Sequence, residues 1–239
     1  MEVFKYRSAG DIISERDQKS IFENLFWFSK LGHLNDPMEG TIDYQNIKIE
    51  AQSMIRKNSK TNDLFVQSMY NTLSSALDSF IDRRTKVGIY SLSKSYNEKL
   101  MWAHYANEHR GYCLGFDYNK LPINHNNNNV YKIPVVYSDR PPKITVDDMN
   151  KLKKDNGHSV IKKLLCYKSK DWSYEKEVRL IVDFPGLVSF PESSISSLYL
   201  GANISSNAKD QLLNLFANSN TSIYQMNINE NYNLIAKEL

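Results

Sequence analysis

The stretch DWSYEKEVRL, residues 171–180, decides how this chain is interpreted. Side chains two positions apart on a β-strand share a face. Glu175, Glu177 and Arg179 therefore project to one side of the strand expected here, and the intervening apolar residues project to the other. We predict that the apolar side anchors the strand in the core and that the three charges line a cleft.

A second interpretation of these charges stays open. Glu175 and Glu177 on a solvent-facing strand edge, with Arg179 as a salt-bridge partner, would be ordinary surface charges. Arg7 is likewise compatible with a surface charge. The stretch LMWAHYA, residues 100–106, fits a packed helix in which His104 is partly buried.

Alternation of apolar and polar residues along the rest of the chain predicts an α+β fold. We expect one domain, residues 1–239, with a mixed and mostly antiparallel sheet and inserted helices. The segments with a strand pattern are residues 3–8, 24–29, 87–93, 112–117, 130–138, 177–184, 195–201, 222–229 and 232–239.

Helices are predicted between these strands. Apolar residues at helical spacing indicate a helical insertion at about residues 44–86 and a helix at 206–219. A helix at residues 96–111 is expected to begin at Asn97 and to stop at Gly111.

Two capping boxes mark further helix starts. Asp36 and Glu39 have the spacing of an N-cap and its third helical residue, and so do Thr145 and Asp148. We expect the second box to begin a helix that runs over residues 145–167.

The composition is that of an ordinary globular protein, with 41% hydrophobic and 24% charged residues and a net charge of +3. Cys113 and Cys166 show no paired spacing, which predicts reduced thiols. The first residues lack a signal pattern, and no apolar run reaches the roughly 18 residues of a membrane helix. We therefore expect a cytoplasmic protein that does not enter the membrane. Phosphate-loop, dinucleotide-fold, zinc-protease and serine-hydrolase motifs are absent from the sequence.

Three blocks of sequence resemble one known family. They are Asn-Asp-Pro-x-Glu at residues 35–39, Met-Trp-x-His-Tyr at 101–105, and Trp-x-Tyr-Glu-x-Glu-x-Arg at 172–179. Together they resemble an uncharacterised bacterial domain-of-unknown-function family. The resemblance spans roughly residues 3–201 and implies a role in phage defence or abortive infection.

The stretch YEKEVRLIV also resembles the Glu-x-Glu strand of the ADP-ribosyltransferase superfamily. One branch of that superfamily carries an arginine, a serine and the Glu-x-Glu pair in this order. Arg7, Ser29 and the pair Glu175 and Glu177 match that order here. Two other serines, Ser91 and Ser93, compete with Ser29 for the second place.

The resemblance implies an enzyme that consumes NAD as its substrate. Cleavage of the nicotinamide–ribose bond develops positive charge on the ribose, as glycoside hydrolysis does. Glu177 would stabilise that charge by holding a ribose hydroxyl, and Glu175 would accept a proton from the acceptor. Arg7 would bind the diphosphate. The aromatic residues expected to stack on nicotinamide or adenine are Tyr6, Trp27, Tyr105 and Trp172.

Two other function classes remain open. A metal-dependent nuclease would use Asp36, Glu39, Glu175 and Glu177 as oxygen ligands for magnesium. A non-catalytic protein-binding module would use the tyrosine-rich surface, since the chain has 15 tyrosines. The enzyme hypothesis implies a toxin or defence effector with a protein, nucleic acid, small molecule or water as acceptor, restrained by a regulatory or antitoxin partner.

Overall fold

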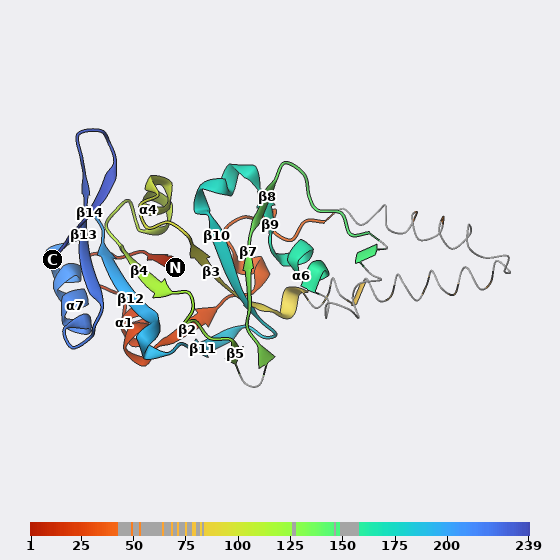
Figure 1. Ribbon diagram of the computed structural model, residues 1–239, viewed down its shortest axis with the longest axis horizontal. Coiled ribbons are helices and arrows are strands. Elements are labelled where there is room, and N and C mark those ends of the chain that lie inside the picture. The colour runs from red at the N-terminus through yellow and green to blue at the C-terminus, as the bar shows by residue number, and fades with distance from the viewer. Residues whose placement is uncertain are drawn as a thin grey trace.

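An eight-stranded β-sheet carries the architecture in the computed structural model of the protein (Figure 1). The strands lie in the order β14-β13-β12-β4-β1-β3-β10-β7, and β12 and β13 are the parallel pair among antiparallel neighbours. The strands are β1 (Glu2–Arg7), β3 (Gly88–Ser93), β4 (Tyr112–Asp117), β7 (Tyr131–Pro134), β10 (Glu177–Val182), β12 (Ile195–Leu200), β13 (Ser222–Ile228) and β14 (Leu234–Glu238). The predicted α+β class and the mixed, mostly antiparallel sheet are confirmed.

The structure describes residues 1–42, 84–125, 128–145 and 158–239, together with residues 147–148 and isolated residues between 49 and 82. The helical elements are α1 (Glu15–Glu23), η1 (Leu31–His33), η2 (Arg84–Lys86), α4 (Lys99–Tyr105), α6 (His158–Leu165), η3 (Lys170–Glu175), η4 (Glu192–Ser194) and α7 (Ser206–Phe216). The small paired strands are β2 (Leu25–Phe28) with β11 (Gly186–Ser189), β5 (Asn124–His125) with β6 (Asn128–Asn129), and β8 (Val136–Ser138) with β9 (Tyr167–Ser169).

The predicted helical insertion at about residues 44–86 lies largely outside the described residues. The isolated described residues between 49 and 82 are helical. None of the described helices has the length and apolar character that a membrane span requires.

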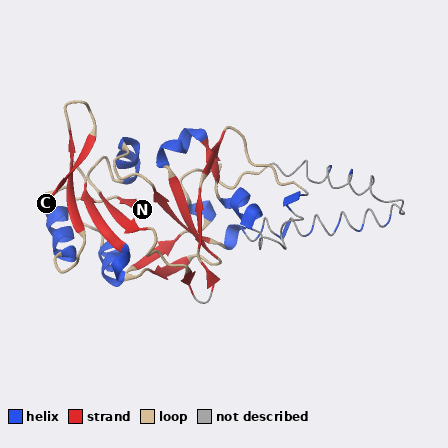
Figure 2. Cartoon of the chain, in the orientation of Figure 1, coloured by secondary structure: helices blue, strands red, loops and turns tan. Residues whose placement is uncertain are grey.

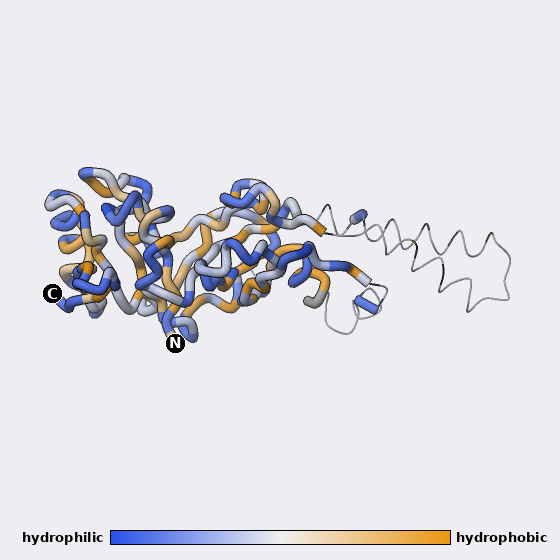
Figure 3. The backbone as a smooth tube through the Cα atoms, turned by 90° about the horizontal axis from the view of Figure 1, so that it is seen from above, coloured by the Kyte–Doolittle hydropathy of each residue, from blue (hydrophilic) through white to orange (hydrophobic). Residues whose placement is uncertain are grey.

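Both faces of the sheet are packed in one α+β domain. The largest apolar cluster joins the sheet to α1, α7 and the β2–β11 ribbon, with Phe26 and Leu212 as buried members. Trp102 of α4 leads a second cluster on the opposite face, and Leu164 of α6 belongs to a third. Figure 2 shows α4 across the sheet from α1 and α7, and Figure 3 shows apolar segments along the central strands.

The sheet is nearly divided between β1 and β3. β1 pairs with β4 over six residues and β10 pairs with β3 over six, whereas β1 and β3 share one pair, Phe4 and Ser93. Beyond that pair the strands diverge, and the Lys5 ammonium donates to the Ser91 carbonyl at 2.9 Å. The Lys5 side chain thus donates to a β3 carbonyl. In a continuous ladder, a backbone N–H of the neighbouring strand would donate to that carbonyl instead.

The helix predicted at residues 96–111 is shorter than expected. Its N-cap is Glu98, without a side-chain cap bond, so the Asn97 cap is wrong; the Asn97 amide oxygen accepts from the Ser95 hydroxyl at 2.9 Å instead. The helix ends at Tyr105 because residues 107–109 take left-handed backbone angles, with φ between 46° and 68°. His104 is exposed rather than partly buried.

The two capping boxes have different outcomes. Thr145 and Asp148 exchange the expected bonds, Thr145 N to Asp148 Oδ2 at 2.8 Å and Asp148 N to Thr145 Oγ1 at 3.3 Å. Most of residues 145–157 lie outside the described residues, and the chain leaves the helical conformation at Cys166. Asp36 accepts from Met38 N at 2.9 Å, but residues 37–40 form a turn and not a helix.

Gly111 packs against the last residue of β1 and offers a test of this junction. A Cβ at Gly111 would lie 2.0 Å from the Arg7 carbonyl oxygen, whereas a Cβ at Gly10 would meet nothing within 4 Å. We expect Gly111→Ala to lower the free energy of unfolding by about 1–3 kcal/mol, because backbone must move. Gly10→Ala should stay within about 0.5 kcal/mol of wild type. Urea unfolding measures both, and equal effects would contradict the close approach.

Candidate functional site

A cavity of about 460 Å³ lies where β1 and β3 diverge. Its volume falls within the range of about 300–1,000 Å³ that is typical of small-molecule sites. Side chains from β1, β3, α1, α4, β9 and the η3–β10 junction line it, together with residues near η1. Charged groups of both signs occur on its wall beside apolar ones, so the cavity is not an apolar packing defect.

One end of the cavity is built on a buried ionic network. Glu39, Lys168, Glu175, Glu177 and Arg179 all have side chains no more than 5% exposed. Lys168 Nζ lies 2.7 Å from Glu175, 3.1 Å from Glu39 and 3.9 Å from Glu177. We call these five residues the ionic network. It holds three carboxylates and two cations. Because these groups are buried, the loss of any one partner would strongly destabilise the fold.

Arg179 fixes the position of Glu177. Its Nε and Nη2 donate to the two carboxylate oxygens of Glu177 at 2.9 and 3.1 Å, in the bidentate geometry that suits a guanidinium. Its remaining donors reach Glu39 and the Leu165 carbonyl. The Glu177 backbone N–H donates to the Tyr137 hydroxyl at 2.8 Å. Glu177 is therefore held from both its side chain and its backbone.

The two glutamates have opposite environments. Burial raises the pKa of Glu175, and its hydrogen bonds from Lys168 at 2.7 Å and the Tyr105 hydroxyl at 2.5 Å offset this only in part. Burial also acts to raise the pKa of Glu177, but the charge and hydrogen bonds of Arg179 and the charge of Lys168 together lower the pKa. Divergent pKa values in adjacent carboxyl groups are what an acid–base pair requires. Glu177 is suited to remain an anion, and Glu175 to accept a proton.

Three cations besides those of the ionic network line the cavity: Lys5, Arg7 and Arg16. Arg7 and Arg16 face Asp17 at 3.8 and 3.6 Å, both longer than a hydrogen bond. Lys5 lies over the Tyr90 ring, 4.6 Å from its centroid. Burial, then the Arg7 charge, lowers the pKa of Lys5 to about 7, although Glu177 and Glu175 act to raise it.

The cavity brings most of the predicted site residues together. Those on its wall are Tyr6, Arg7, Ser29, Tyr105, Glu175 and Glu177, and the competing serines Ser91 and Ser93 line it as well. The serine assignment therefore stays open. Trp27 lies outside the cavity with 55% of its surface exposed, and Trp172 lies outside with its ring 4.6 Å below Lys168 Nζ.

Two expectations for the opening stretch are wrong. Glu175 ends η3 and does not lie on β10, because Lys176 takes a left-handed conformation with φ 48°. The alternative of a solvent-facing strand edge also fails, since β10 is flanked by β3 and β7 and all six of its residues are buried. The charges face the interior, where their partners are.

Sequence reasoning missed Lys5 and Lys168 and underrated Glu39. Lys168 lies on a three-residue strand whose pattern carries no signal of burial. Glu39 was assigned to a capping box, but its carboxylate pairs with Lys168 and Arg179. Lys168 and Glu175 are seven positions apart in the sequence, and only the fold shows that they meet.

Three of the four carboxylates proposed as magnesium ligands lie close together, but they pair with cationic side chains. Glu39, Glu175 and Glu177 surround Lys168, whereas Asp36 caps a turn. Within the residues that the structure describes, no group of three or more His, Cys, Asp or Glu side chains is arranged to hold a metal ion. Cys113 and Cys166 are free and buried, as expected of thiols.

Residues 101–180 match a family described as protein of unknown function (DUF2971). This agrees with the predicted likeness to a domain-of-unknown-function family. The matched segment begins in α4 and ends in β10, so it includes Tyr105, Lys168, Glu175 and Glu177. No curated protein and no solved structure matches the chain.

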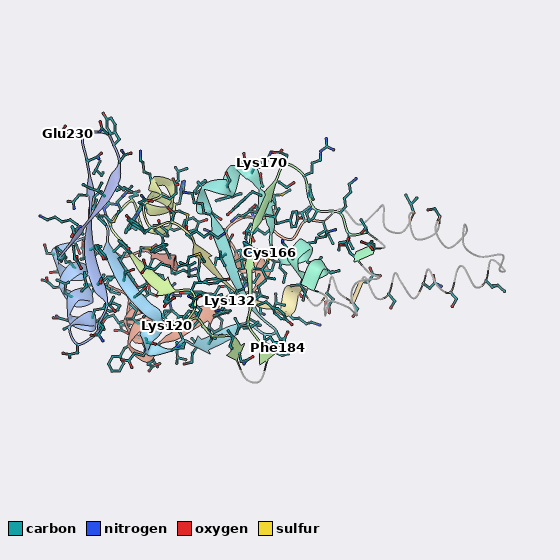
Figure 4. All side chains as sticks on the ribbon, in the orientation of Figure 1. Lys120, Lys132, Cys166, Lys170, Phe184 and Glu230 are labelled. Carbon is teal, nitrogen blue, oxygen red and sulfur yellow. The ribbon has the colours of Figure 1, made fainter. Side chains whose placement is uncertain are left out.

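The ionic network yields a prediction for stability. Arg179→Met leaves buried Glu177 and Glu39 without their main counter-charge, so we expect the free energy of unfolding to fall by about 3–5 kcal/mol. Lys170→Met breaks an ion pair with Asp139 on the outer surface, where Figure 4 places Lys170, and should cost no more than about 1 kcal/mol. Denaturant unfolding compares them; a small loss in Arg179→Met would contradict the assigned pairing.

Lys5 yields a prediction for pH dependence. Its pKa is about 7 in the folded protein and 10.5 ordinarily, so the unfolded chain binds more protons between these values. The free energy of unfolding contributed by Lys5 therefore rises with pH across that window. We expect wild type to gain stability from pH 7 to 10 relative to Lys5→Met, measured by thermal melting. Parallel curves would show that Lys5 titrates normally.

Proposed function

We propose that this protein is an NAD-consuming enzyme that breaks the nicotinamide–ribose bond, as an ADP-ribosyltransferase or an NAD glycohydrolase. The observation that carries the proposal is the cavity itself. Glu175 and Glu177, in opposite electrostatic environments, line it together with Arg7 on β1. A carboxylate for the ribose and a guanidinium for the diphosphate are the two recognition elements that such a reaction needs.

The chemistry follows from the roles of the two glutamates. The bond between ribose C1′ and the nicotinamide nitrogen breaks, and its electron pair goes to nicotinamide, which leaves neutral. Positive charge develops at C1′ and is stabilised by Glu177, which Arg179 holds in place. The acceptor then bonds to C1′ and gives its proton to Glu175.

Other residues of the cavity would position the substrate. Tyr105 lines the cavity, and its hydroxyl donates a hydrogen bond to Glu175. The Tyr105 ring would therefore lie beside the nicotinamide of the bound substrate. Tyr6 is held by a hydrogen bond to the Ser95 carbonyl at 2.8 Å and by edge contact with Trp102, which makes it a rigid wall. Ser29, Ser91 and Ser93 line the same cavity and could supply hydroxyls to the substrate.

The fold and the cellular role belong to the same proposal. The mixed sheet that divides at the cavity supports an ADP-ribosyltransferase-like fold, because the glutamates and Arg7 then lie on opposite sides of the division. A role as a toxin or phage-defence effector, with a macromolecular acceptor or a restraining partner, rests on the resemblance of the sequence blocks.

Nicotinamide release tests the proposal. We expect purified wild type, with or without bacterial lysate, to release nicotinamide from NAD, and Glu177→Gln to lose about 10²–10³-fold of this rate because a developing charge loses its partner. Glu192→Gln, an exposed glutamate far from the cavity, should retain full activity. Glu175→Gln should lower the rate with less effect on folding, because Glu175 does not pair with Arg179.

Thermal melting of each variant shows whether a lower rate of nicotinamide release comes from the removed side chain or from loss of the folded structure. Absence of release by folded wild type in both conditions would remove the proposal. Stabilisation of that protein by magnesium and not by NAD would then favour the nuclease alternative.

A further inference from the structure

Lys5 lines the cavity but takes no part in the proposed bond cleavage. It is partly exposed on β1, and its Nζ donates to the Ser91 carbonyl at 2.9 Å and lies 4.6 Å from the centre of the Tyr90 ring. Lys168, on the same cavity, pairs with three carboxylates, whereas Lys5 has no carboxylate partner within the described part of the chain. The two lysines therefore present different chemistry to a ligand.

The surroundings of Lys5 favour its neutral form. A lysine becomes a nucleophile when removal from water or a neighbouring cation drives off its proton. Both conditions hold here, because Lys5 packs over the Tyr90 ring and Arg7 lies two positions along β1, on the same face. Together they lower the pKa of Lys5 to about 7, so that about half of this side chain is neutral at pH 7. An ordinary lysine is almost fully protonated at that pH.

A neutral Lys5 can react without leaving its position. The Ser91 carbonyl accepts a single hydrogen bond from Nζ, and a neutral amine still has an N–H to donate. Its lone pair is then available to a carbonyl compound in the cavity. The nitrogen bonds to the carbon of an aldehyde, a proton passes from the nitrogen to the aldehyde oxygen, and the adduct loses water to leave an imine. The step requires no other reactant.

Arg7 indicates which aldehyde would bind beside Lys5. Its guanidinium also lines the cavity, and its contact with Asp17, at 3.8 Å, is longer than a hydrogen bond, so its donors remain available to an anion. A guanidinium donates bidentate hydrogen bonds to phosphate. Positions two apart on a strand lie about 7 Å apart, which is comparable to the distance between the aldehyde carbon and the phosphate of an open-chain pentose phosphate.

We infer that Lys5 is a covalent site that forms an imine with the aldehyde of a sugar phosphate, whose phosphate is bound by Arg7. The site goes beyond the proposed function and does not depend on it. ADP-ribose, which hydrolysis of NAD yields, belongs to the same chemical class, because its free ribose end opens to an aldehyde. Under the proposed function, Lys5 would therefore retain this product in the cavity.

Reductive trapping on the full chain tests the covalent site. Wild type is incubated at pH 7 with ribose 5-phosphate and cyanoborohydride, which reduces an imine to a stable amine, and peptide mass spectrometry assigns the adducts. We expect Lys5 to carry at least about ten times the adduct found on Lys132 or Lys168, because it combines a neutral amine with access to the cavity.

Lys132 and Lys168 are matched controls within the same chain. Lys132 has surroundings like those of Lys5, since its Nζ donates to the carbonyls of Tyr118 and Leu121, each at 3.0 Å, but it does not line the cavity. Lys168 lines the cavity, but the carboxylates around it raise its pKa although burial acts to lower it. Labelling of either at the level of Lys5 would overturn the assignment.

Comparison with ribose tests the phosphate contact. Relative to Lys132 in the same samples, Lys5 should be labelled about tenfold more by ribose 5-phosphate than by ribose, as one charge-assisted hydrogen bond predicts. Arg7→Gln should reduce this preference below about threefold. Arg140→Gln removes an exposed arginine outside the cavity and should retain the preference. Equal labelling of wild type by the two sugars would remove Arg7 from the site.

Absence of a Lys5 adduct in folded wild type would overturn the covalent site and leave Lys5 as a structural donor to Ser91. The outcome is separable from that of the proposed function. If both hold, wild type with NAD and cyanoborohydride should carry ADP-ribose on Lys5, whereas Glu177→Gln should carry it only when ADP-ribose itself is added. An adduct without nicotinamide release would keep this site and remove the proposed function; release without an adduct would do the reverse.

Discussion

The Arg179 guanidinium is the interaction on which the rest of this structure depends. It is 1% exposed and lies in the interior of the sheet, where an unpaired charge would be prohibitive. Its donors bind Glu177, Glu39 and the Leu165 carbonyl, and so join β10 to the turn at residues 37–40 and to the end of α6. Buried ion pairs of this kind are often no more stable than an apolar core of equal volume. Their value here lies in position: they hold carboxylates at defined places on a cavity wall.

The division of the sheet creates the space that these charges face. With a single residue pair between β1 and β3, the two halves of the sheet remain joined while their strands separate. The Lys5 ammonium satisfies the Ser91 carbonyl at the division, so the opening does not leave that backbone acceptor without a partner. On the other side of β1, Gly111 lets the start of β4 pass close to the Arg7 carbonyl. The sparse pairing of β1 with β3 and the Lys5 side chain together shape the cavity.

Electrostatics then divides the cavity into regions with different chemistry. Three carboxylates and two cations form the ionic network, which gives that end one negative charge more than positive. Lys5, Arg7, Arg16 and Asp17 line the cavity as well and are not part of this network. The bidentate bond to Arg179 and the hydroxyl of Tyr105 further distinguish Glu177 from Glu175.

The sequence by itself determined the features that depend on local periodicity and local hydrogen bonding. Alternation in EVRLIV predicted a strand with its apolar side in the core, and the spacing of Thr145 and Asp148 predicted a cap that forms as expected. The α+β class and most strand positions followed in the same way, because side-chain period and capping act within a few residues. The association of Arg7, a serine and the two glutamates came from a resemblance, and the cavity brings these residues together.

Only the tertiary structure decided which charges meet. Glu39 and Arg179 are 140 positions apart, and no local pattern relates them. One left-handed residue, Lys176, removes Glu175 from the strand that alternation assigned to it and turns it toward Lys168 and Tyr105. The partner of a buried charge depends on which segments the fold brings into contact. A buried charge without such a partner would be costly. For this reason the residues that carry charge could be identified from the sequence, whereas their partners and their pKa values could not.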